Sequence, residues 1–146
     1  AQFLFGHGDG AANSALWAMY AGVGVTLGHN FPFYLHFRGG KGIACLAGIL
    51  STMDLRIMVS CMLVFGLAVG ITRYVSLGSI LVSLVFLAEL IFFGSQGSYQ
   101  VTEACFPEFC ILGAFLTFMA IWRHRANIKR LLSGTENKLG AKKKTS

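Results

Sequence analysis

Residues 57–93 have the sequence IMVSCMLVFGLAVGITRYVSLGSILVSLVFLAELIFF, in which Arg73 is the only basic residue and Glu89 the only acidic one. Two apolar runs, 57–72 and 75–93, therefore flank a short polar turn. A helix needs about 20 apolar residues to cross the hydrocarbon core of a membrane, which is roughly 30 Å thick. The stretch predicts two consecutive helices that cross a membrane in opposite directions.

Three more apolar segments lie at 14–27, 43–53 and 109–122. Several segments are shorter than about 20 residues, so they need their neighbours or a locally thinner bilayer in order to span. The segment 43–53 is the weakest candidate. The whole chain is 55% hydrophobic and 12% charged, whereas about 25% of the residues of a soluble domain are charged. We predict an all-α, polytopic transmembrane helix bundle with about five membrane segments, formed by residues 1–146 as a single domain.

Basic residues gather at the C-terminus. The net charge is +6, and eight of the twelve Lys and Arg residues follow Ala120. Such a run can bind nucleic acid, but directly after an apolar helix it is more typical of a cytoplasmic end beside anionic lipid headgroups. We therefore predict a basic cytoplasmic tail at 123–146 and no nucleic-acid partner. Alternation of the helices places Arg73 and the 31–42 loop on the same side, and the 94–103 loop, which lacks Lys and Arg, on the other.

Small and polar residues inside the apolar runs have structural explanations. Gly66 and Gly70 have the GxxxG spacing that lets helix backbones touch in lipid, so we expect them to pack against another helix. Glu89 is costly in an apolar run unless it is paired, protonated or faces a polar cavity. Its place near the outer end of its segment favours a structural role, with a catalytic role as the alternative.

The four cysteines show neither the CxxC pattern nor the paired spacing of a zinc or redox site, so we predict no metal and no cofactor. Cys45 and Cys61 lie inside apolar segments and are expected to be small core residues. Cys105 and Cys110 lie near a predicted external loop, where a disulfide is chemically permitted, but we expect none.

The loop at 28–42, GHNFPFYLHFRGGKG, places Gly39, Gly40 and Gly42 around Lys41, directly before an apolar segment. Glycines let successive backbone N–H groups point into one concavity, and a helix N-terminus and an ammonium group add positive charge, so the pattern indicates a phosphate site. It is not a Walker A motif, because Gly42 follows the lysine and Leu35 occupies the leading position. Taken alone, the pattern is also compatible with a plain turn.

The stretch at 124–138, HRANIKRLLSGTENK, follows the last apolar segment. If it is helical, His124 and Asn127 share a face, and Gly134 ends the helix before a polar turn at 135–138. A histidine at a membrane boundary can contact headgroups or take part in catalysis. Ser76 and Ser79, at the start of another segment, can equally cap that helix or contact a substrate.

The stretches GHNFP and FRGGKG at 28–42, RYVSLGSI at 73–80 and RHRANIKRLLSGTENK at 123–138 occur in one order along the chain. Together they resemble the acyl-phosphate:glycerol-3-phosphate acyltransferases of bacterial membranes. The resemblance implies a seven-helix protein of the bacterial inner membrane with a cytoplasm-facing site built from three motifs. It implies transfer of a fatty acyl group from acyl phosphate to the sn-1 hydroxyl of glycerol 3-phosphate, giving lysophosphatidic acid and phosphate. It also implies that membrane lipids surround the protein.

The resemblance also implies roles for individual residues. The expected catalytic residues are Lys41, Ser79, His124 and Asn127. The expected substrate-binding residues are His29, Asn30, Arg38, Gly39, Gly40, Gly42, Thr135, Glu136 and Asn137. Lys41 and the nearby amides would hold phosphate, whereas His124 and Asn127 would orient glycerol phosphate. The proton of the attacking hydroxyl could go to His124 or to the phosphate of the substrate itself.

The chain departs from the family pattern at its N-terminus. The stretch GHGDGAAN at 6–13 is too close to Gly28 to be the first motif, so we expect the N-terminal helices and that motif to come from a missing segment or another membrane chain. Cys45 also replaces a usual threonine. Two alternatives to an acyltransferase are therefore a non-catalytic membrane remnant or subunit, and an anion carrier, although no inverted repeat supports a carrier.

Overall fold

The computed structural model describes residues 12–37 and 39–141. In this part of the chain all regular structure is helical, as predicted. The elements, in chain order, are α2 (Ser14–Asn30), η2 (Phe33–Leu35), α3 (Ile43–Met53), α4 (Leu55–Thr72), α5 (Val75–Ser95), η3 (Glu103–Cys105), α6 (Phe106–Arg123) and α7 (Arg125–Leu132).

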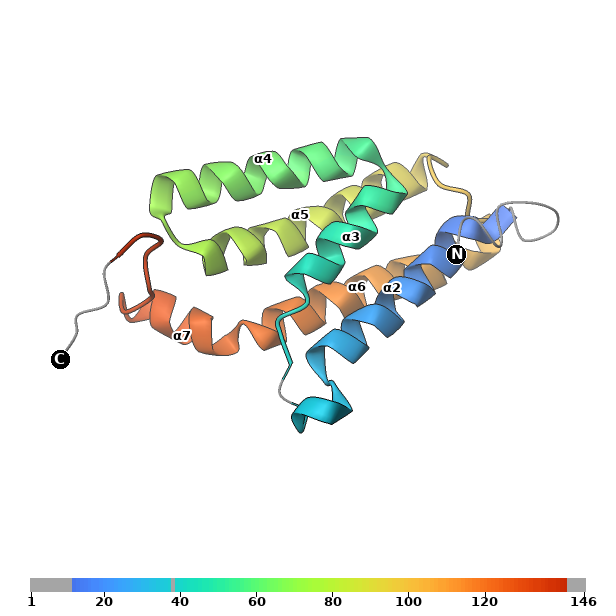
Figure 1. The fold of residues 1–146 in the computed structure, drawn as a ribbon. Coiled ribbons are helices and arrows are strands. Elements are labelled where there is room, and N and C mark those ends of the chain that lie inside the picture. The colour runs from blue at the N-terminus through green and yellow to red at the C-terminus, as the bar shows by residue number, and fades with distance from the viewer. Residues whose placement is uncertain (1–11, 38, 142–146) are drawn as a thin grey trace.

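The long helices form a bundle (Figure 1), and its interior is filled by apolar side chains. Helix α4 packs on α5, α5 packs on α6, and α2 packs on both α3 and α6, while α3 also contacts α4. Met19, Ile57, Phe86, Leu90 and Phe109 are fully buried where these helices meet. The side chains that point outward are also largely apolar, which suits a bundle surrounded by lipid.

Three helical stretches are long and apolar enough to cross a membrane: Leu55–Thr72, Val75–Ser95 and Glu103–Arg123. The other two predicted segments are helical as well, but α2 has 17 residues and α3 has 11. At 1.5 Å per residue, α3 is only about half as long as the hydrocarbon core is thick. The architecture is therefore the predicted membrane helix bundle, and three of the five segments are both long enough and apolar enough to cross a membrane.

The glycines of α2 and α4 differ in whether another helix packs against them. A Cβ atom on Gly22 would lie 2.7 Å from the Ile49 side chain, so this glycine allows α2 and α3 to approach closely. Gly66 and Gly70 were expected to pack in the same way, but a Cβ on either would meet nothing within 4 Å. Their predicted packing is wrong for the described residues, because this face of α4 points away from every other described helix.

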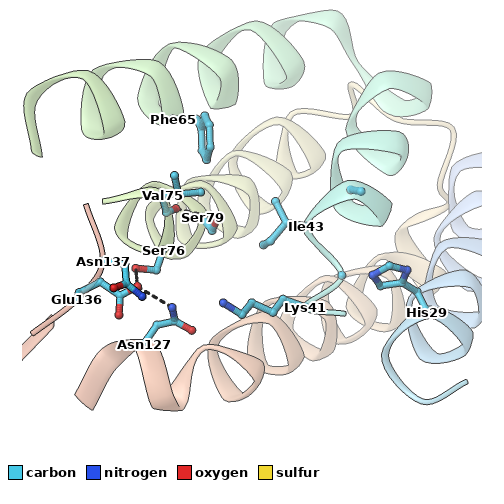
Figure 2. A pocket seen from close by; sticks show the side chains of 12 residues that line it. His29, Lys41, Ile43, Phe65, Val75, Ser76, Ser79, Asn127, Glu136 and Asn137 are labelled. Atoms are coloured by element: carbon cyan, nitrogen blue, oxygen red, sulfur yellow. Dashed lines mark hydrogen bonds between the residues drawn. The ribbon is translucent and has the colours of Figure 1, made fainter. Parts of the chain in front are cut away.

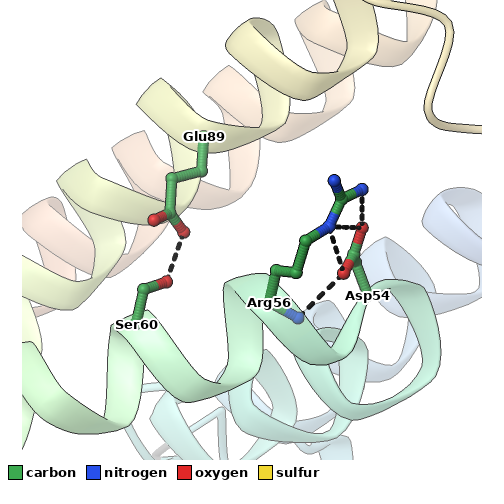
Figure 3. Close-up of polar contacts among 4 residues, drawn as sticks. All are labelled: Asp54, Arg56, Ser60 and Glu89. Atoms are coloured by element: carbon green, nitrogen blue, oxygen red, sulfur yellow. Dashed lines mark hydrogen bonds and ion pairs between the residues drawn. The ribbon is translucent and has the colours of Figure 1, made fainter.

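Polar contacts join the helices at the end of the bundle where α2 begins. The Thr102 backbone N–H and hydroxyl donate to Asn13 Oδ1 at 2.9 and 3.1 Å. The carboxylate of Asp54 accepts from the backbone N–H of Arg56 at the start of α4 and also pairs with the Arg56 guanidinium. As Figure 3 shows, Ser60 donates to Glu89 Oε2 at 2.7 Å, which pairs the carboxylate within the apolar run. This contact supports the structural role expected for Glu89.

The other end of the bundle brings together three segments predicted to lie on the same side. The Arg73 guanidinium donates to the Leu139 carbonyl at 2.7 and 3.0 Å. Arg123 donates to the Gly39 and Gly40 carbonyls. The α4–α5 turn, the glycine loop and the C-terminal segment thus meet at one end, away from the 94–103 loop.

The four cysteines are free thiols, also as expected.

Candidate active site

A pocket of about 490 Å³ opens at the end where the glycine loop, the start of α5 and the C-terminal segment meet, and Figure 2 shows its lining. Side chains and backbone from α2, α3, α4, α5, α7 and the C-terminal turn contribute to it. The lining residues are His29, Lys41, Gly42, Ile43, Ala44, Phe65, Val75, Ser76, Ser79, Asn127, Glu136 and Asn137. Seven of the residues predicted for the site are therefore brought together: His29, Lys41, Gly42, Ser79, Asn127, Glu136 and Asn137.

Lys41 supplies the positive charge of the pocket. In Figure 2 its side chain points toward Asn127 and Glu136. Both ion pairs found between side chains of the described residues involve other groups, Arg56 with Asp54 and Arg130 with Glu136. The ammonium group of Lys41 is therefore not neutralised by a protein carboxylate in this part of the chain, and it remains available to an anionic ligand.

Gly42 leads the chain from Lys41 into α3. Its φ of 76° is in the left-handed region that favours glycine, and it occupies the N-cap position without a side-chain cap. The first N–H groups of a helix have no intrahelical partners. Because Gly42, Ile43 and Ala44 line the pocket, the N-terminus of α3 faces it, and an anion beside Lys41 would also experience the helix dipole.

Gly39 and Gly40 lie beside the pocket rather than in its lining, although both were predicted to bind substrate. A Cβ on Gly39 would clash with the His29 carbonyl oxygen, and a Cβ on Gly40 would clash with the His29 ring. The Gly40 N–H donates to the His29 carbonyl at 3.2 Å. Arg123 fastens both carbonyls from α6, at 2.6 and 2.9 Å. These two glycines allow the loop to pack tightly on the end of α2.

Asn30, also predicted to bind substrate, lies outside the pocket lining. It is fully buried, and it lies behind Gly42, where a Cβ would be 3.2 Å from Asn30 Oδ1 and 3.2 Å from Thr26 Cγ2. Neither polar atom of the Asn30 side chain has a hydrogen-bond partner among the described residues, and nor does the Thr26 hydroxyl. Asn30 therefore supports the loop from behind and does not line the pocket.

Glu136 joins three elements at the edge of the pocket. Its carboxylate accepts from Ser76 at 3.0 Å, from Asn127 at 2.8 Å and from Arg130 at 2.8 Å. Burial alone would raise the pKa of Glu136, but these hydrogen bonds hold that pKa below its ordinary value. The carboxylate therefore stays charged, and it holds the amide of Asn127 in place at the pocket wall.

His124 lies between α6 and α7, and only 2% of it is exposed. Its Nδ1 is 2.7 Å from the Ala120 carbonyl oxygen. A carbonyl only accepts hydrogen bonds, so Nδ1 carries the hydrogen. Burial lowers the pKa of the imidazole and outweighs the hydrogen bond to the Ala120 carbonyl, which raises it, while the nearby Lys41 lowers the pKa further. The ring is consequently neutral, with its acceptor lone pair on Nε2. His124 is outside the pocket lining but close to Lys41.

Ser76 and Ser79 both line the pocket, and neither caps α5. Ser76 donates to Glu136, whereas Ser79 donates to the Val75 carbonyl one turn earlier, at 3.0 Å. Capping is therefore excluded as the reason for these serines. Each hydroxyl keeps its lone pairs as potential acceptors for a ligand.

The remaining predicted residues are less informative. Thr135 is exposed, and its hydroxyl is 2.7 Å from that of Ser133 in the turn after α7. It is outside the pocket lining. Arg38 lies outside the described residues. The residues that the structure describes include no group of three or more His, Cys, Asp or Glu side chains that could hold a metal ion.

A second hollow adjoins the polar pocket. It is an apolar groove of about 210 Å³ lined by Ile43, Ala47, Leu50, Cys61, Met62, Phe65 and Val82. Ile43 and Phe65 line both hollows. The site therefore changes from a polar end beside Lys41 to an apolar end between α3, α4 and α5.

Comparison with known proteins identifies the family of the chain. A family model described as glycerol-3-phosphate acyltransferase matches residues 1–134. The chain belongs to this family. Among curated members it is 42% identical, over 126 residues, to glycerol-3-phosphate acyltransferase of Thermoanaerobacter sp. strain X514, covering 86% of this chain and 58% of that protein. The enzyme of the same name from Halalkalibacterium halodurans is 39% identical over 133 residues, or 89% of this chain and 60% of that protein.

Solved structures of a family member are also similar. The crystal structure of PlsY (YgiH), an integral membrane glycerol 3-phosphate acyltransferase, in its glycerol 3-phosphate form gives a TM-score of 0.69 at 29% identity and covers 84% of this chain and 56% of PlsY. The lysophosphatidic acid form gives the same TM-score and identity. The chain spans a little over half the length of the relatives that it matches.

Several site residues are not evident from the sequence. Arg123 and Arg130 belong to a basic tail by composition, yet Arg123 holds the glycine loop and Arg130 holds Glu136. Their positions on each side of the His124–Asn127 pair are the only local signal. Ile43 and Phe65 are part of ordinary apolar runs, and only the packing of α3 and α4 shows that they line both hollows.

Proposed function

We propose that the chain transfers a fatty acyl group from acyl phosphate to the sn-1 hydroxyl of glycerol 3-phosphate, giving lysophosphatidic acid and phosphate. The observation that carries this proposal is the junction of the Lys41 pocket with an apolar groove. A phosphate needs the former, and a hydrocarbon chain needs the latter. Family membership and the titles of the two PlsY structures, which name glycerol 3-phosphate and lysophosphatidic acid, support it independently.

One group of residues would bind phosphate, and another would orient glycerol 3-phosphate. Lys41, with the N–H groups of Gly42, Ile43 and Ala44, would hold a phosphate at the N-terminus of α3. The acyl chain would lie in the groove beyond Ile43 and Phe65. Asn127, held by Glu136, and Ser79 would orient glycerol 3-phosphate from the opposite wall. This arrangement supplies proximity and charge stabilisation.

The reaction needs no covalent intermediate. The hydroxyl oxygen of glycerol 3-phosphate attacks the acyl carbonyl carbon, an ester C–O bond forms, and the C–O bond to phosphate breaks. Phosphate leaves with the electron pair, close to Lys41. The hydroxyl proton would pass to His124 Nε2, whose neutral ring is suited to accept it, or to a substrate phosphate. His124 is a candidate positioning or basic group beside the pocket.

We also propose the location and orientation of the protein. It would lie in the bacterial inner membrane with the pocket and the basic 123–146 tail on the cytoplasmic side, where anionic headgroups and soluble glycerol 3-phosphate are found. The convergence of Arg73, the glycine loop and the C-terminal segment at one end supports this assignment.

A reconstituted assay tests the function. Release of phosphate from palmitoyl phosphate is measured in vesicles with and without glycerol 3-phosphate, together with formation of lysophosphatidic acid. Lys41→Ala should lower acyl transfer by about 100-fold, the usual effect of removing one charge-stabilising group. Lys129→Ala, which removes an exposed lysine outside the pocket, is the matched control and should retain full activity.

The alternatives give different results in this assay. Acyl transfer that survives Lys41→Ala would contradict the role of the loop. Phosphate flux across the vesicle membrane without acyl transfer would indicate a carrier. Activity that appears only after a further membrane segment is added would indicate that this chain acts as a subunit.

A further inference from the structure

The segment between α2 and the glycine loop has an unusual surface. Residues 33–37, which we call the aromatic turn, comprise the short helix η2 and the two residues after it. The exposed fractions of its apolar side chains are 81% for Phe33, 70% for Tyr34, 51% for Leu35 and 64% for Phe37. Four large apolar side chains in one turn are therefore directed away from the protein, which is a poor arrangement in contact with water.

The backbone holds this arrangement firmly. The N–H groups of Leu35 and Phe37 both donate to the Pro32 carbonyl, at 3.1 and 3.0 Å, and the His36 N–H donates to the Phe33 carbonyl at 3.2 Å. His36 and Phe37 have φ values of 51° and 59°. A left-handed conformation costs a residue with a side chain roughly 1–2 kcal/mol. The chain therefore adopts an unfavourable conformation at two consecutive positions while its aromatic side chains remain exposed.

The surroundings favour a lipid surface over a protein partner. Trp122 is 41% exposed, with the Arg125 guanidinium 4.7 Å from its ring centre. Arg123 lies 5.5 Å from the ring centre of Phe31, at the base of the aromatic turn. Exposed aromatic side chains beside arginines are typical of the headgroup region, where an aromatic ring meets the acyl chains and a cation meets the phosphates. The positive charge at this end complements an anionic membrane surface.

We infer that the aromatic turn inserts into the headgroup and upper acyl region of the bilayer leaflet on the pocket side. This membrane contact is separate from the spanning helices, because the turn lies beyond the end of α2. Residues 39–42 follow the turn closely, so the contact fixes the height of the Lys41 loop relative to the bilayer. The head of any ligand whose tail remains in lipid would then reach Lys41 without leaving the membrane surface.

Fluorescence tests the inference without requiring activity. The two tryptophans, Trp17 and Trp122, are replaced by Phe, and a single tryptophan is introduced by Phe33→Trp. The protein is reconstituted in vesicles of phosphatidylethanolamine and phosphatidylglycerol. We expect strong quenching by lipids brominated near the top of the acyl chain and weak quenching by aqueous iodide. Gln96→Trp, in an exposed turn at the other end, is the matched control and should show the opposite pattern.

Two results would overturn the inference. Strong iodide quenching at position 33 with no effect of brominated lipid would place the turn in water. Protection from both quenchers would show that protein covers it, either a second copy of this chain or another segment.

A second measurement links the turn to the site and rests on the proposed function. The double variant Phe33→Ser and Phe37→Ser should raise the apparent KM for membrane-borne palmitoyl phosphate about tenfold and leave the KM for glycerol 3-phosphate unchanged. An equal rise in both constants would show that the turn only supports the fold of the loop. If no acyl transfer is found at all, the proposed function fails, whereas the fluorescence result still decides whether the turn contacts lipid.

Discussion

The two ends of the bundle use polar residues in different ways. At the end where α2 begins, polar side chains pair with one another: Asn13 with Thr102, Asp54 with Arg56 and Ser60 with Glu89. At the pocket end, Lys41 has no carboxylate partner among the described residues, and the buried Thr26 and Asn30 have unpaired polar atoms. Among the described residues at the first end, the one buried side-chain atom without a partner is the Tyr99 hydroxyl oxygen.

This difference separates structural polar groups from functional ones. A buried polar group costs free energy unless it is hydrogen-bonded, so groups that only stabilise the fold are expected to be paired within it. An ammonium group that lines a pocket without a carboxylate partner among the described residues, as Lys41 does, instead remains available to an anionic ligand, whereas Thr26 and Asn30 lie outside the pocket lining. Glu136 lies at the pocket end, but by this criterion it is a structural group, because three donors from the protein already satisfy its carboxylate.

The largest expected effect on stability appears in a comparison of two carboxylates, Glu136 at the pocket end and Glu89 at the other end. Glu136→Ala should lower the free energy of unfolding by about 3 kcal/mol, because Arg130 and Asn127 lose a charged partner. Glu89→Ala should cost only about 1 kcal/mol, since Ser60 retains its second acceptor, the Ile57 carbonyl. Thermal unfolding in detergent measures both. Equal losses would show that the two ends do not differ in how they use carboxylates.

Two glycines with positive φ sharpen the comparison. Gly42→Ala and Gly97→Ala introduce a side chain at φ values of 76° and 70°, but only the first would contact its neighbours, Thr26 and Asn30. We expect Gly42→Ala to raise the KM for glycerol 3-phosphate about tenfold, corresponding to roughly 1.4 kcal/mol. Gly97→Ala should leave that KM unchanged. Steady-state kinetics at saturating acyl phosphate provides the measurement, and similar KM values for both variants would refute the packing explanation.

The buried histidine makes stability depend on pH. Because burial lowers the pKa of His124 in the folded state, the unfolded state binds a proton first as pH falls. The contribution of His124 is therefore complete above pH 6.5, the approximate pKa of an unperturbed histidine, and is lost as pH falls toward the lowered value.

A thermal melting series between pH 7.5 and pH 5.5 measures this effect. His124→Asn should flatten the decline. Glu136 does not confuse the result, because its pKa is lowered from a value that already lies below this range. A decline that is just as steep in His124→Asn would show that another group titrates.

The smallest effect concerns the outward face of α4. Gly66→Ala and Gly70→Ala should each stabilise the protein by about 0.5–1 kcal/mol, since alanine favours a helix and no neighbour obstructs its methyl group. Gly22→Ala should instead destabilise it, because the new methyl group would press on Ile49. Melting temperatures of the three variants test this contrast. Destabilisation by Gly66→Ala or Gly70→Ala would indicate that something packs on this face in the membrane.

Local patterns predicted the helices well and the site less completely. The apolar runs place all five predicted segments within a few residues of their observed ends, because length and composition decide whether a stretch can leave water. Lys41, Asn127 and Ser79 were predicted from motifs and do line one pocket. Gly39 and Asn30 were predicted from the same stretch as Lys41, but Gly39 packs against the end of α2 and Asn30 is buried behind Gly42. Nothing in their local sequence distinguishes contact with a ligand from contact with the rest of the protein.

The sequence alone determined that the chain is a membrane helix bundle, the approximate bounds of its five apolar helices, and that a glycine-lysine loop precedes α3. These properties depend on residues close together in the chain, so local composition is sufficient to predict them. Only the tertiary structure decided that Glu136 binds Ser76 and Asn127, that Arg123 holds the loop and that the α4 glycines face outward. These contacts join residues far apart in sequence, and they depend on how the helices pack and rotate against one another.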